Sequence, residues 1–291
     1  MKKIAILGCE NSHANAFITY VKEREEFADI EVIGVYSDDT AAAEKLHETF
    51  GVPVMTDYAD AVGKIDGLII TARHGDNHYK YAKPYIASKI PMFIDKPITV
   101  SEADAIAFMT ELSENGVRVT GGSSLKHDDL VISLKADREN AVGGKTLGGF
   151  IRAPYQSENE YGGFYFYAQH LVEMVCEIYG RYPMSVAARK NGAQINVTFR
   201  YEDYDCVGLF CDKSYCYFAS RMAEKTSKGA AIPTTKEWYY REFKEFYALL
   251  AEDAQGASYN ELISPVFIMN GIERSLISGK EEKISYPDIR G

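Results

Sequence analysis

Histidines are the residues of this sequence whose placement first suggests chemistry. Five of the six follow predicted strands or lie in the part of the chain predicted to face those strand ends: His13, His74, His78, His127 and His170. Imidazole groups, with the nearby carboxylates of Glu10 and Asp76, suit zinc or manganese. Hydrogen bonding to a sugar or polyol explains the same residues without an ion. We favour that interpretation and predict no metal site.

A lysine follows one of the apolar runs that predict buried strands. The run at 92–94 leads into Asp95, Lys96 and Pro97. A lysine at the carboxyl end of a parallel strand faces the crevice in which α/β proteins bind ligands. Its ammonium group can donate a hydrogen bond to a carbonyl or alcohol oxygen, so Lys96 is a candidate catalytic residue.

The turn after the first apolar run has the position of a phosphate-binding loop. A strand, a glycine and a helix place a pyrophosphate on the free amides of that helix. The fingerprint G-x-G-x-x-G falls on Gly8, Glu10 and His13, so only the first glycine is present. A carboxylate about 4 Å from a phosphate would cost on the order of 4 kcal/mol at an effective dielectric constant of 20. Either Glu10 points away from the cofactor, or its carboxylate caps the helix and takes the anion site itself. Asn11 and Ser12 are also residue types that cap helices.

The ribose of a dinucleotide would lie at the end of the second predicted strand, beside Ser37 and Asp38. Asp38 can accept hydrogen bonds from a ribose 2′-hydroxyl, and no arginine follows Ser37 to bind a 2′-phosphate. NAD is therefore slightly favoured over NADP. Capping of the next helix by this segment is an equally good explanation of these residues.

Strand and helix patterns alternate over the first 120 residues. Predicted strands cover 3–7, 30–36, 67–71, 92–94 and 117–120, and predicted helices cover 13–24, 40–50, 77–88 and 101–115. Ser101 caps the last helix and Gly116 ends it. The alternation favours a doubly wound parallel sheet, so the fold class is α/β with a dinucleotide-binding Rossmann domain over residues 1–122.

The pattern changes after residue 122. Helices are predicted near 128–138, 164–179, 237–253 and 264–278, and strands near 150–156, 184–190, 194–200, 205–211 and 215–220. Consecutive alternating strands are typical of an antiparallel sheet. We predict an α+β domain over residues 123–291 that binds substrate and mediates oligomerisation.

Composition excludes several classes of function. The formal net charge is −10, which argues against nucleic acid as a partner, and no apolar run approaches the ~18 residues of a membrane span. Five cysteines without a CxxC pair indicate reduced thiols and a cytoplasmic protein. Cys206, Cys211 and Cys216 fit no common zinc spacing, so we interpret them as packing residues.

Four stretches together carry a family resemblance. They are the strand 66–71 ending in Thr71 with His78 seven residues later, the run 94–98 containing Asp95-Lys96-Pro97, the stretch 122–135, and Gly162-Gly163 leading to His170. This pattern resembles the Gfo/Idh/MocA family of oxidoreductases. The likeness covers most of the chain, is strong over 60–135 and fades after about 190. Asp95 stands where the family has glutamate.

The resemblance implies roles for individual residues. Lys96 matches the family's catalytic lysine, which contacts substrate and nicotinamide, and His170 matches its catalytic histidine. The family's aspartate four residues before that histidine is Phe166 here, so a hydroxyl from Tyr161, Tyr165 or Tyr167 is a candidate substitute. Tyr167 is our choice as a third catalytic residue. The predicted cofactor contacts are Gly8, Glu10, Asn11, Ser12, His13, Ser37, Asp38, Thr71, His74, His78, Asp95, Lys96 and Pro97, and the predicted substrate contacts are Lys96, Lys126, His127, Tyr155, Tyr167 and His170.

The resemblance implies an NAD(P)-dependent oxidoreductase that transfers a hydride to or from a sugar, polyol or related hydroxy compound. A homodimer or homotetramer formed through the second sheet is expected. Two alternatives stay open. One is a ligand-binding or regulatory member of the family without redox chemistry, favoured by Glu10 and Phe166. The other is a metal-dependent lyase or hydrolase that uses the histidines.

Overall fold

The computed structural model describes residues 1–289, which divide into two compact units. The first unit comprises Met1–Gly122, Lys236–Leu262 and Ile289, and the second comprises Ser123–Thr235 and Ile263–Asp288. Each unit has its own β-sheet.

The first unit is built on a parallel sheet of five strands. In the order β2-β1-β3-β4-β5 these are β2 (Ile30–Tyr36), β1 (Lys2–Leu7), β3 (Gly67–Ile70), β4 (Met92–Asp95) and β5 (Val119–Gly122). The chain passes from β1 to β2 on one side and to β3 on the other, so the order reverses between β1 and β3. Ligands of doubly wound sheets bind at this switch point. The predicted fold class is confirmed.

Helices flank the strands of this sheet, and most begin and end as predicted. They are α1 (Ser12–Glu23), α2 (Thr40–Phe50), α3 (Asp76–Ala82), α4 (Glu102–Asn115) and α7 (Glu237–Ala251). Ser101 Oγ accepts from the Asp104 N–H at the start of α4, and left-handed Gly116 follows its end. The helix predicted over 77–88 instead changes to the 3-10 turn η2 (Lys83–Ser88), because Pro84 lacks the N–H that an α-helix needs.

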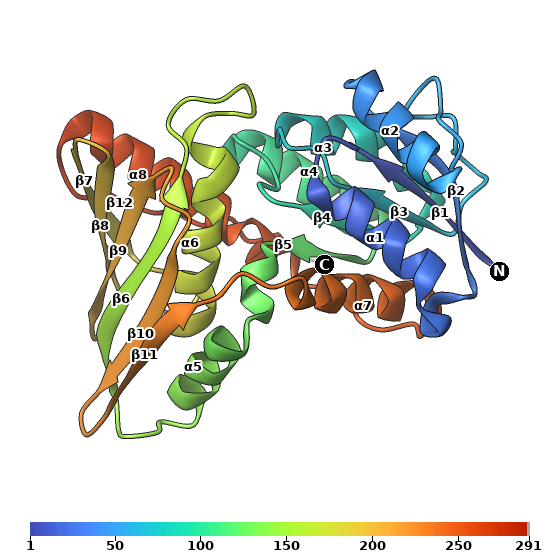
Figure 1. The fold of residues 1–291 in the computed structure, drawn as a ribbon. Coiled ribbons are helices and arrows are strands. Elements are labelled where there is room, and N and C mark those ends of the chain that lie inside the picture. The colour runs from blue at the N-terminus through green and yellow to red at the C-terminus, as the bar shows by residue number, and fades with distance from the viewer. Residues whose placement is uncertain (290–291) are drawn as a thin grey trace. The chain divides into compact units, whose positions relative to one another are not determined.

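Helix α7 belongs to the first unit, although the sequence placed it in the second domain. It packs beside α1, and Figure 1 shows α7 (orange) next to α1 (blue). The ring of Phe243 lies 5.2 Å from that of Phe17 and 4.8 Å from that of Phe27. Because helical periodicity shows that a face is apolar but not which partner covers it, the sequence could not assign this helix.

The second unit is a mostly antiparallel sheet of seven strands, as predicted. In the order β11-β10-β6-β9-β8-β7-β12 these are β11 (Ser227–Ile232), β10 (Tyr217–Ala223), β6 (Thr146–Tyr155), β9 (Asp205–Asp212), β8 (Gln194–Arg200), β7 (Ser185–Asn191) and β12 (Glu282–Lys283). Among the strand pairs that the structure describes in this sheet, β6–β9 alone is parallel. Strands β11 and β12 were not predicted, because β11 is almost wholly exposed and β12 has two residues.

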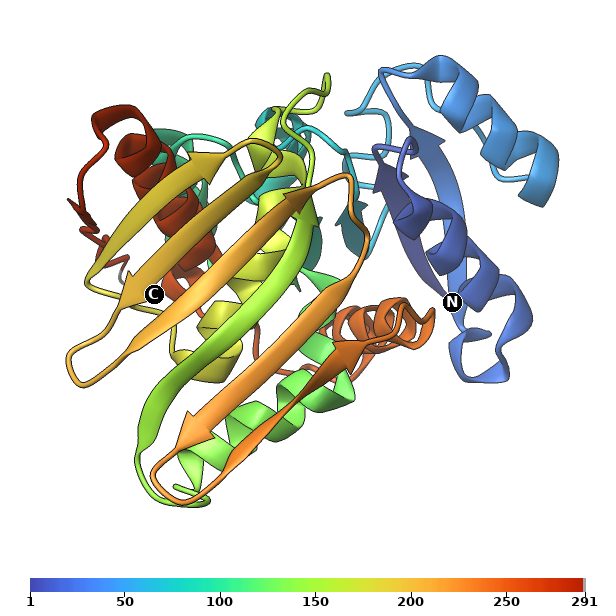
Figure 2. The same ribbon diagram turned by 60° about the vertical axis from the view of Figure 1, so that its left-hand side comes forward.

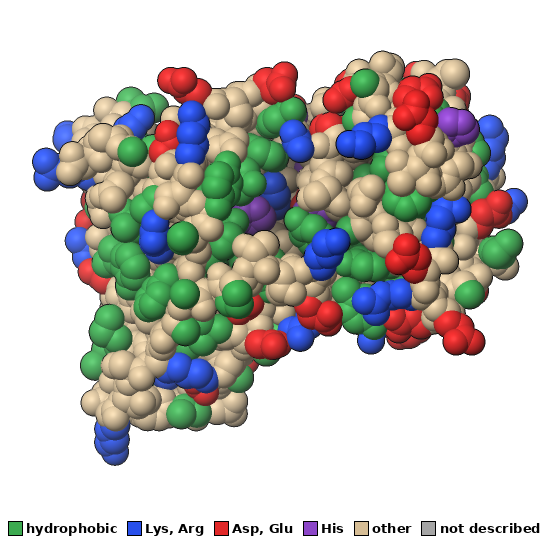
Figure 3. All heavy atoms as spheres, in the orientation of Figure 1, with side chains coloured by type: hydrophobic (Ala, Val, Ile, Leu, Met, Phe, Trp, Pro, Cys, Tyr) green, Lys and Arg blue, Asp and Glu red, His purple; other side chains and the backbone are tan. Residues whose placement is uncertain are grey.

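One face of this sheet is covered by α6 (Phe164–Tyr179), which packs on β6 and β9 (Figure 2). The unit also contains η3 (Ser124–His127), α5 (Asp129–Glu139) and most of α8 (Tyr259–Ser278). Nearly every residue of α6 is buried, so its side chains form the core of this unit. Hydrophobic side chains also gather on the surface of the second unit (Figure 3), and they include the half-exposed Leu147, Val207 and Met222 of its strands.

No helix within residues 1–289 is long and apolar enough to cross a membrane.

The backbone conformation and the close contacts of the turn after β1 require glycine at position 8. Gly51, a second glycine with positive φ, provides the comparison. Gly8 has φ +86°, and a Cβ there would lie 2.2 Å from the backbone nitrogen of Ala72. Gly51 has φ +69° and no atom within 4 Å of such a Cβ. We expect Gly51→Ala to lower the free energy of unfolding by about 1–2 kcal/mol, from backbone strain alone. Gly8→Ala should lose roughly 1–3 kcal/mol more through the clash.

Urea unfolding followed by the fluorescence of Trp238, the single tryptophan of the chain and a buried residue of the first unit, measures both variants. Equal losses in the two proteins would contradict the close approach of Gly8 to Ala72.

Candidate functional site

The imidazole of His13 lies between two buried carboxylates at the start of α1. Its Nδ1 is 3.3 Å from Asp95 Oδ2 at the end of β4, and its Nε2 is 3.1 Å from Glu242 Oε2 on α7. All three side chains are nearly inaccessible to solvent. Asn11 Nδ2 donates a 2.5 Å hydrogen bond to the same Asp95 oxygen. The third fingerprint position is thus a buried ionic link between α1, β4 and α7.

Charge in this cluster shifts the pKa values of its cationic members. Burial lowers the pKa of His13, but the carboxylates of Asp95 and Glu242 outweigh that effect and leave it above 6.5. Burial also lowers the pKa of Lys96, and here the same two carboxylates oppose the shift only in part. Two carboxylates, one imidazolium and one ammonium are charge-balanced, which is the condition for holding ionised groups away from water.

Glu10 does not cap α1. Its Oε2 accepts a 2.6 Å hydrogen bond from Ser37 Oγ, just after β2, and its Oε1 accepts a 2.9 Å bond from the backbone N–H of Arg73, after β3. The carboxylate therefore points toward the ends of the neighbouring strands β2 and β3 and not toward the amides at the start of α1. Asn11, the N-cap residue, makes no capping bond with its side chain either.

These features fit a dinucleotide. Its pyrophosphate requires unblocked amides at a helix N-terminus, and the side chain of Asn11, the N-cap residue of α1, makes no capping hydrogen bond. The helix begins at the β1/β3 switch point, where doubly wound folds bind nucleotides. Gly8, Ser12 and the amides that follow are the residues of this chain that would hold the phosphates.

Asp38 is engaged by its neighbours. Its Oδ1 accepts a 2.7 Å bond from the Tyr36 hydroxyl, and its Oδ2 lies 3.2 Å from Lys80 Nζ. Desolvation raises the pKa of Asp38, but hydrogen bonds from Tyr36, Tyr81 and Lys80 lower it overall. The negative charge of Asp38 is therefore stabilised by a hydroxyl and an ammonium group of the protein itself.

Of the predicted contacts after β3, two support the loop backbone. Thr71 Oγ1 donates a 2.5 Å bond to the carbonyl of Gly8. His78 is fully buried, with Nε2 2.8 Å from the Ala72 carbonyl and Nδ1 3.2 Å from that of Ile98, and burial lowers its pKa. His78 therefore braces the loop rather than facing a ligand, contrary to its expected role as a cofactor contact. The half-exposed His74 lies 3.8 Å from Asp76.

Lys96 and Pro97 lie where β4 ends, as predicted. Asp95 Oδ1 accepts a 2.7 Å bond from the backbone N–H of Lys96, so this aspartate orders the backbone of its neighbour as well as pairing with His13. The Lys96–Pro97 peptide bond is cis.

In the second unit, His170 on α6 is oriented by Ser123, which the sequence reasoning missed. Ser123 Oγ is 2.7 Å from His170 Nδ1 and also accepts from the Leu125 N–H at 3.3 Å. The ring of Tyr167 lies 5.5 Å from the imidazole. The position of Ser123, one residue after β5, is the feature of the sequence that could have identified it.

The other predicted substrate contacts divide between interior and surface. Tyr155 is buried at the end of β6, and its ring packs 6.1 Å from that of Phe210. Tyr165 donates to Glu273, which commits its hydroxyl. His127 is buried in η3 and Lys126 beside it is half-buried.

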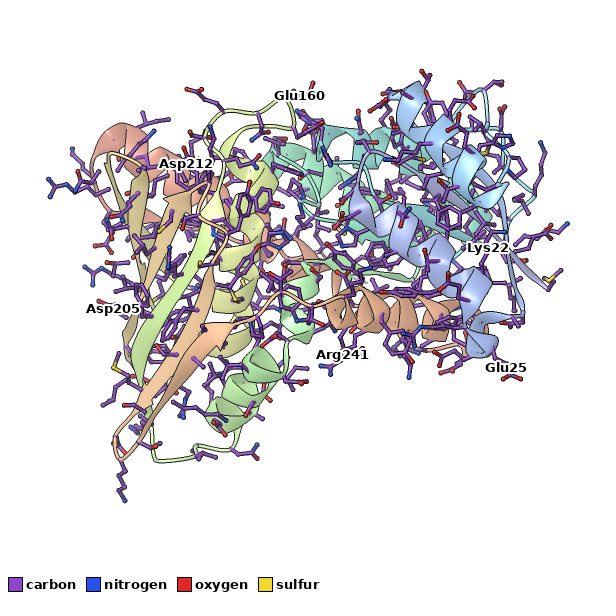
Figure 4. The ribbon with its side chains drawn as sticks, viewed as in Figure 1. Lys22, Glu25, Glu160, Asp205, Asp212 and Arg241 are labelled. Atoms are coloured by element: carbon purple, nitrogen blue, oxygen red, sulfur yellow. The ribbon has the colours of Figure 1, made fainter. Side chains whose placement is uncertain are left out.

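The loop that leads into α6 is anchored to the end of β9. The backbone N–H of Ser157 donates to Asp212 Oδ1 at 3.3 Å. Figure 4 labels Asp212 and, on the same loop as Ser157, Glu160. This contact ties the loop before α6, the helix that carries His170, to the sheet of the second unit.

The histidines do not gather around a common point. Within residues 1–289, no group of three or more His, Cys, Asp or Glu side chains has an arrangement that could hold a metal ion.

Part of the first unit matches a known protein family. Residues 2–123 match the model of the oxidoreductase family with the NAD-binding Rossmann fold (Gfo/Idh/MocA), which confirms the expected resemblance. No curated protein matches the sequence.

Solved structures share the fold of the whole chain. A myo-inositol 2-dehydrogenase from Lactobacillus plantarum has a TM-score of 0.84 at 13% identity, covering 98% of this chain and 99% of its own. A scyllo-inositol dehydrogenase from Lactobacillus casei, with bound NAD(H) and scyllo-inositol, has a TM-score of 0.83 at 13% identity, covering 97% and 99%. A myo-inositol dehydrogenase from Corynebacterium glutamicum has a TM-score of 0.81 at 16% identity, covering 99% and 100%.

The buried His13 pair predicts a pH dependence of stability. Because the folded-state pKa lies above 6.5, the stabilisation is fully present below pH 6.5 and is lost as the pH rises through the folded-state value. His13→Gln should remove that decline and cost roughly 3 kcal/mol at pH 6, since two buried carboxylates lose their cation. Burial lowers the pKa of His78, so this residue makes the free energy of unfolding rise with pH below pH 6.5. The effect is the same in the wild type and in His13→Gln, and the difference between their unfolding free energies therefore reports His13 alone.

Urea unfolding of the wild type and the variant from pH 6 to 9 provides the measurement. His47→Gln, on the exposed side of α2, is the control and should keep the wild-type slope. A His13→Gln protein with that same slope would show that His13 is not the titrating group.

Proposed function

We propose that this chain, whose residues 2–123 form a Rossmann domain of the Gfo/Idh/MocA oxidoreductase family, is an NAD(P)-dependent dehydrogenase of a polyol or sugar. The observation that carries the proposal is Lys96 at the carboxyl end of β4, held beside the buried Asp95 in a domain of that family. When bound, the nicotinamide accepts or supplies the hydride.

Lys96 is the residue to polarise the reacting oxygen. Burial lowers the pKa of its ammonium group, which makes it a better proton donor near neutral pH than an ordinary lysine. The carboxylates of Asp95 and Glu242 oppose that shift, because negative charge nearby favours the ammonium form. The expected role is a hydrogen bond to the substrate oxygen, which stabilises negative charge as it develops.

His170 is the acid or base that exchanges the hydroxyl proton. Ser123 Oγ lies at Nδ1 and so fixes the orientation of the imidazole ring. A hydroxyl orients the ring as the family's aspartate would, but it brings no negative charge to stabilise an imidazolium. Tyr167 is the adjacent hydroxyl that can complete the proton path, and His127 and Lys126 remain substrate contacts of the proposal.

A polyol is the substrate class that we propose. The structural relatives described above include dehydrogenases of inositols, one with scyllo-inositol bound. Lysine and histidine side chains supply the hydrogen bonds that vicinal hydroxyls need. Free cysteines, four of them buried, support a reducing, cytoplasmic location.

Self-association through the second sheet is part of the proposal. Leu147, Val207 and Met222 expose apolar side chains along its strands. Exposed apolar groups on neighbouring strands support an interface between copies of the chain. We infer a homodimer or homotetramer.

Substitution of the two proposed catalytic residues tests the function. Lys96→Met and His170→Gln should each lower kcat with NAD and an inositol by about 100-fold or more, since each removes proton donation or acceptance in the transition state. Dissociation constants for NADH, measured by fluorescence titration, should change little in His170→Gln. Lys83→Met, at a lysine of η2, is the control and should retain wild-type kcat.

If neither NADH nor NADPH binds to the wild type below millimolar concentration, the dehydrogenase proposal fails and a non-redox ligand-binding role takes its place. Stoichiometric zinc or manganese in the purified protein would instead support the lyase or hydrolase alternative.

The Ser123 contact predicts a distinct kinetic effect. Ser123→Ala should reduce kcat by roughly tenfold and displace the limb of the pH–rate profile that reports His170, because Nδ1 loses its partner. Ser123→Thr retains a hydroxyl and should restore most of the activity and the original profile. If Ser123→Ala leaves the pH–rate profile unchanged, Ser123 has no role in orienting His170 during catalysis.

A further inference from the structure

We propose that Glu10, rather than the acid that follows β2, binds the adenosine ribose hydroxyls and makes the site selective for NAD over NADP. The inference rests on the proposed function, because it concerns the cofactor site of that activity. It assigns a specificity role to the residue that replaces the second fingerprint glycine.

The position of the Glu10 carboxylate supports this role. In doubly wound folds, an acid at the end of the second strand accepts hydrogen bonds from the ribose 2′-hydroxyl. Glu10 starts from the turn after β1, but its Oε2 lies 2.6 Å from the hydroxyl of Ser37, which is the first residue after β2. The side chain therefore delivers a carboxylate to the strand end at which a ribose-binding acid is expected.

The Glu10 carboxylate is also held in one orientation, and its oxygens can accept further hydrogen bonds. Ser37, itself buried, and the Arg73 N–H each donate one hydrogen bond to a different oxygen. Each carboxylate oxygen can accept a further hydrogen bond. A vicinal diol presents two O–H donors, and this pair of fixed acceptors matches it.

Asp38, the acid that the sequence pointed to, is poorly suited to the same task. Its two oxygens already accept from Tyr36 and Lys80 at 2.7 and 3.2 Å. The Lys80 ammonium group also lies 5.5 and 5.3 Å from the ring centres of Tyr58 and Tyr81, so it is engaged on several sides. The two acids differ in what holds them: Asp38 is paired with the positive charge of Lys80, whereas Glu10 is held by an uncharged hydroxyl and a backbone N–H and keeps its negative charge unpaired by these contacts.

The same geometry explains how an acid is tolerated in a phosphate-binding turn. Glu10 is bound to groups that follow β2 and β3, and it does not occupy the first-turn amides of α1. A 2′-phosphate on the ribose, by contrast, would approach the carboxylate directly and be repelled. Selection against NADP follows from that repulsion.

Binding of the reduced dinucleotides to the full chain tests the inference, with fluorescence titration as the measurement. Wild type should bind NADH at least about tenfold more tightly than NADPH. Glu10→Gln retains an acceptor for the Arg73 N–H but loses the charge, so it should bind NADH more weakly and reduce the NADPH:NADH ratio of dissociation constants to about threefold or less.

Two further variants separate Glu10 from other acids at this strand end. Asp39→Asn removes one negative charge while keeping a good N-cap for α2, and it should keep the wild-type ratio. Asp38→Asn should also keep it. A ratio that collapses in Asp38→Asn but not in Glu10→Gln would overturn the inference, as would tighter binding of both dinucleotides by Glu10→Gln, which would make Glu10 an obstruction.

Failure of the proposed function has a different outcome. If neither the wild type nor any variant binds a dinucleotide, the dehydrogenase proposal is lost and this inference with it. If the wild type binds NADH and Glu10→Gln leaves the ratio unchanged, only the role of Glu10 is lost. Circular dichroism of each variant verifies that it is folded.

Discussion

The contact on which the first unit most depends is the imidazole of His13 between Asp95 and Glu242. Charges taken out of water must be neutralised where they lie, because removing one partner leaves an uncompensated charge in the core. The three residues come from α1, β4 and α7, so these elements are held together at one point. Lys96 follows Asp95 in the chain and donates its backbone N–H to that carboxylate, so the Asp95–His13 contact also helps to position the Lys96 backbone.

Local patterns in the sequence were sufficient to predict most of the fold. The alternation of short apolar runs and helices specified the parallel sheet, and Ser101 and Gly116 marked the ends of α4. Such features depend on neighbours within a few residues along the chain. The strand end that carries Lys96 was predictable for the same reason, since it needs only a buried run followed by a polar residue.

Long-range contacts were not predictable from the sequence. Glu242 lies more than 200 residues from His13, and its helix was assigned to the wrong part of the chain. Ser123 reaches His170 across 47 residues of the chain, and no local pattern in the sequence indicates that contact. His78 was expected to face a ligand, but burial and two backbone carbonyls make it structural.

The departures from the glycine fingerprint are connected. Glycine lets a phosphate approach because it has no side chain to interfere. In this turn every large side chain is instead bound to a neighbouring element: Glu10 to Ser37 and Arg73, Asn11 to Asp95, and His13 to Asp95 and Glu242. Asn11, the N-cap residue, is among these side chains, and it makes no capping bond to the amides of α1. A turn with one fingerprint glycine can thus present the same backbone donors as a turn with three, provided that its side chains are held by other parts of the domain.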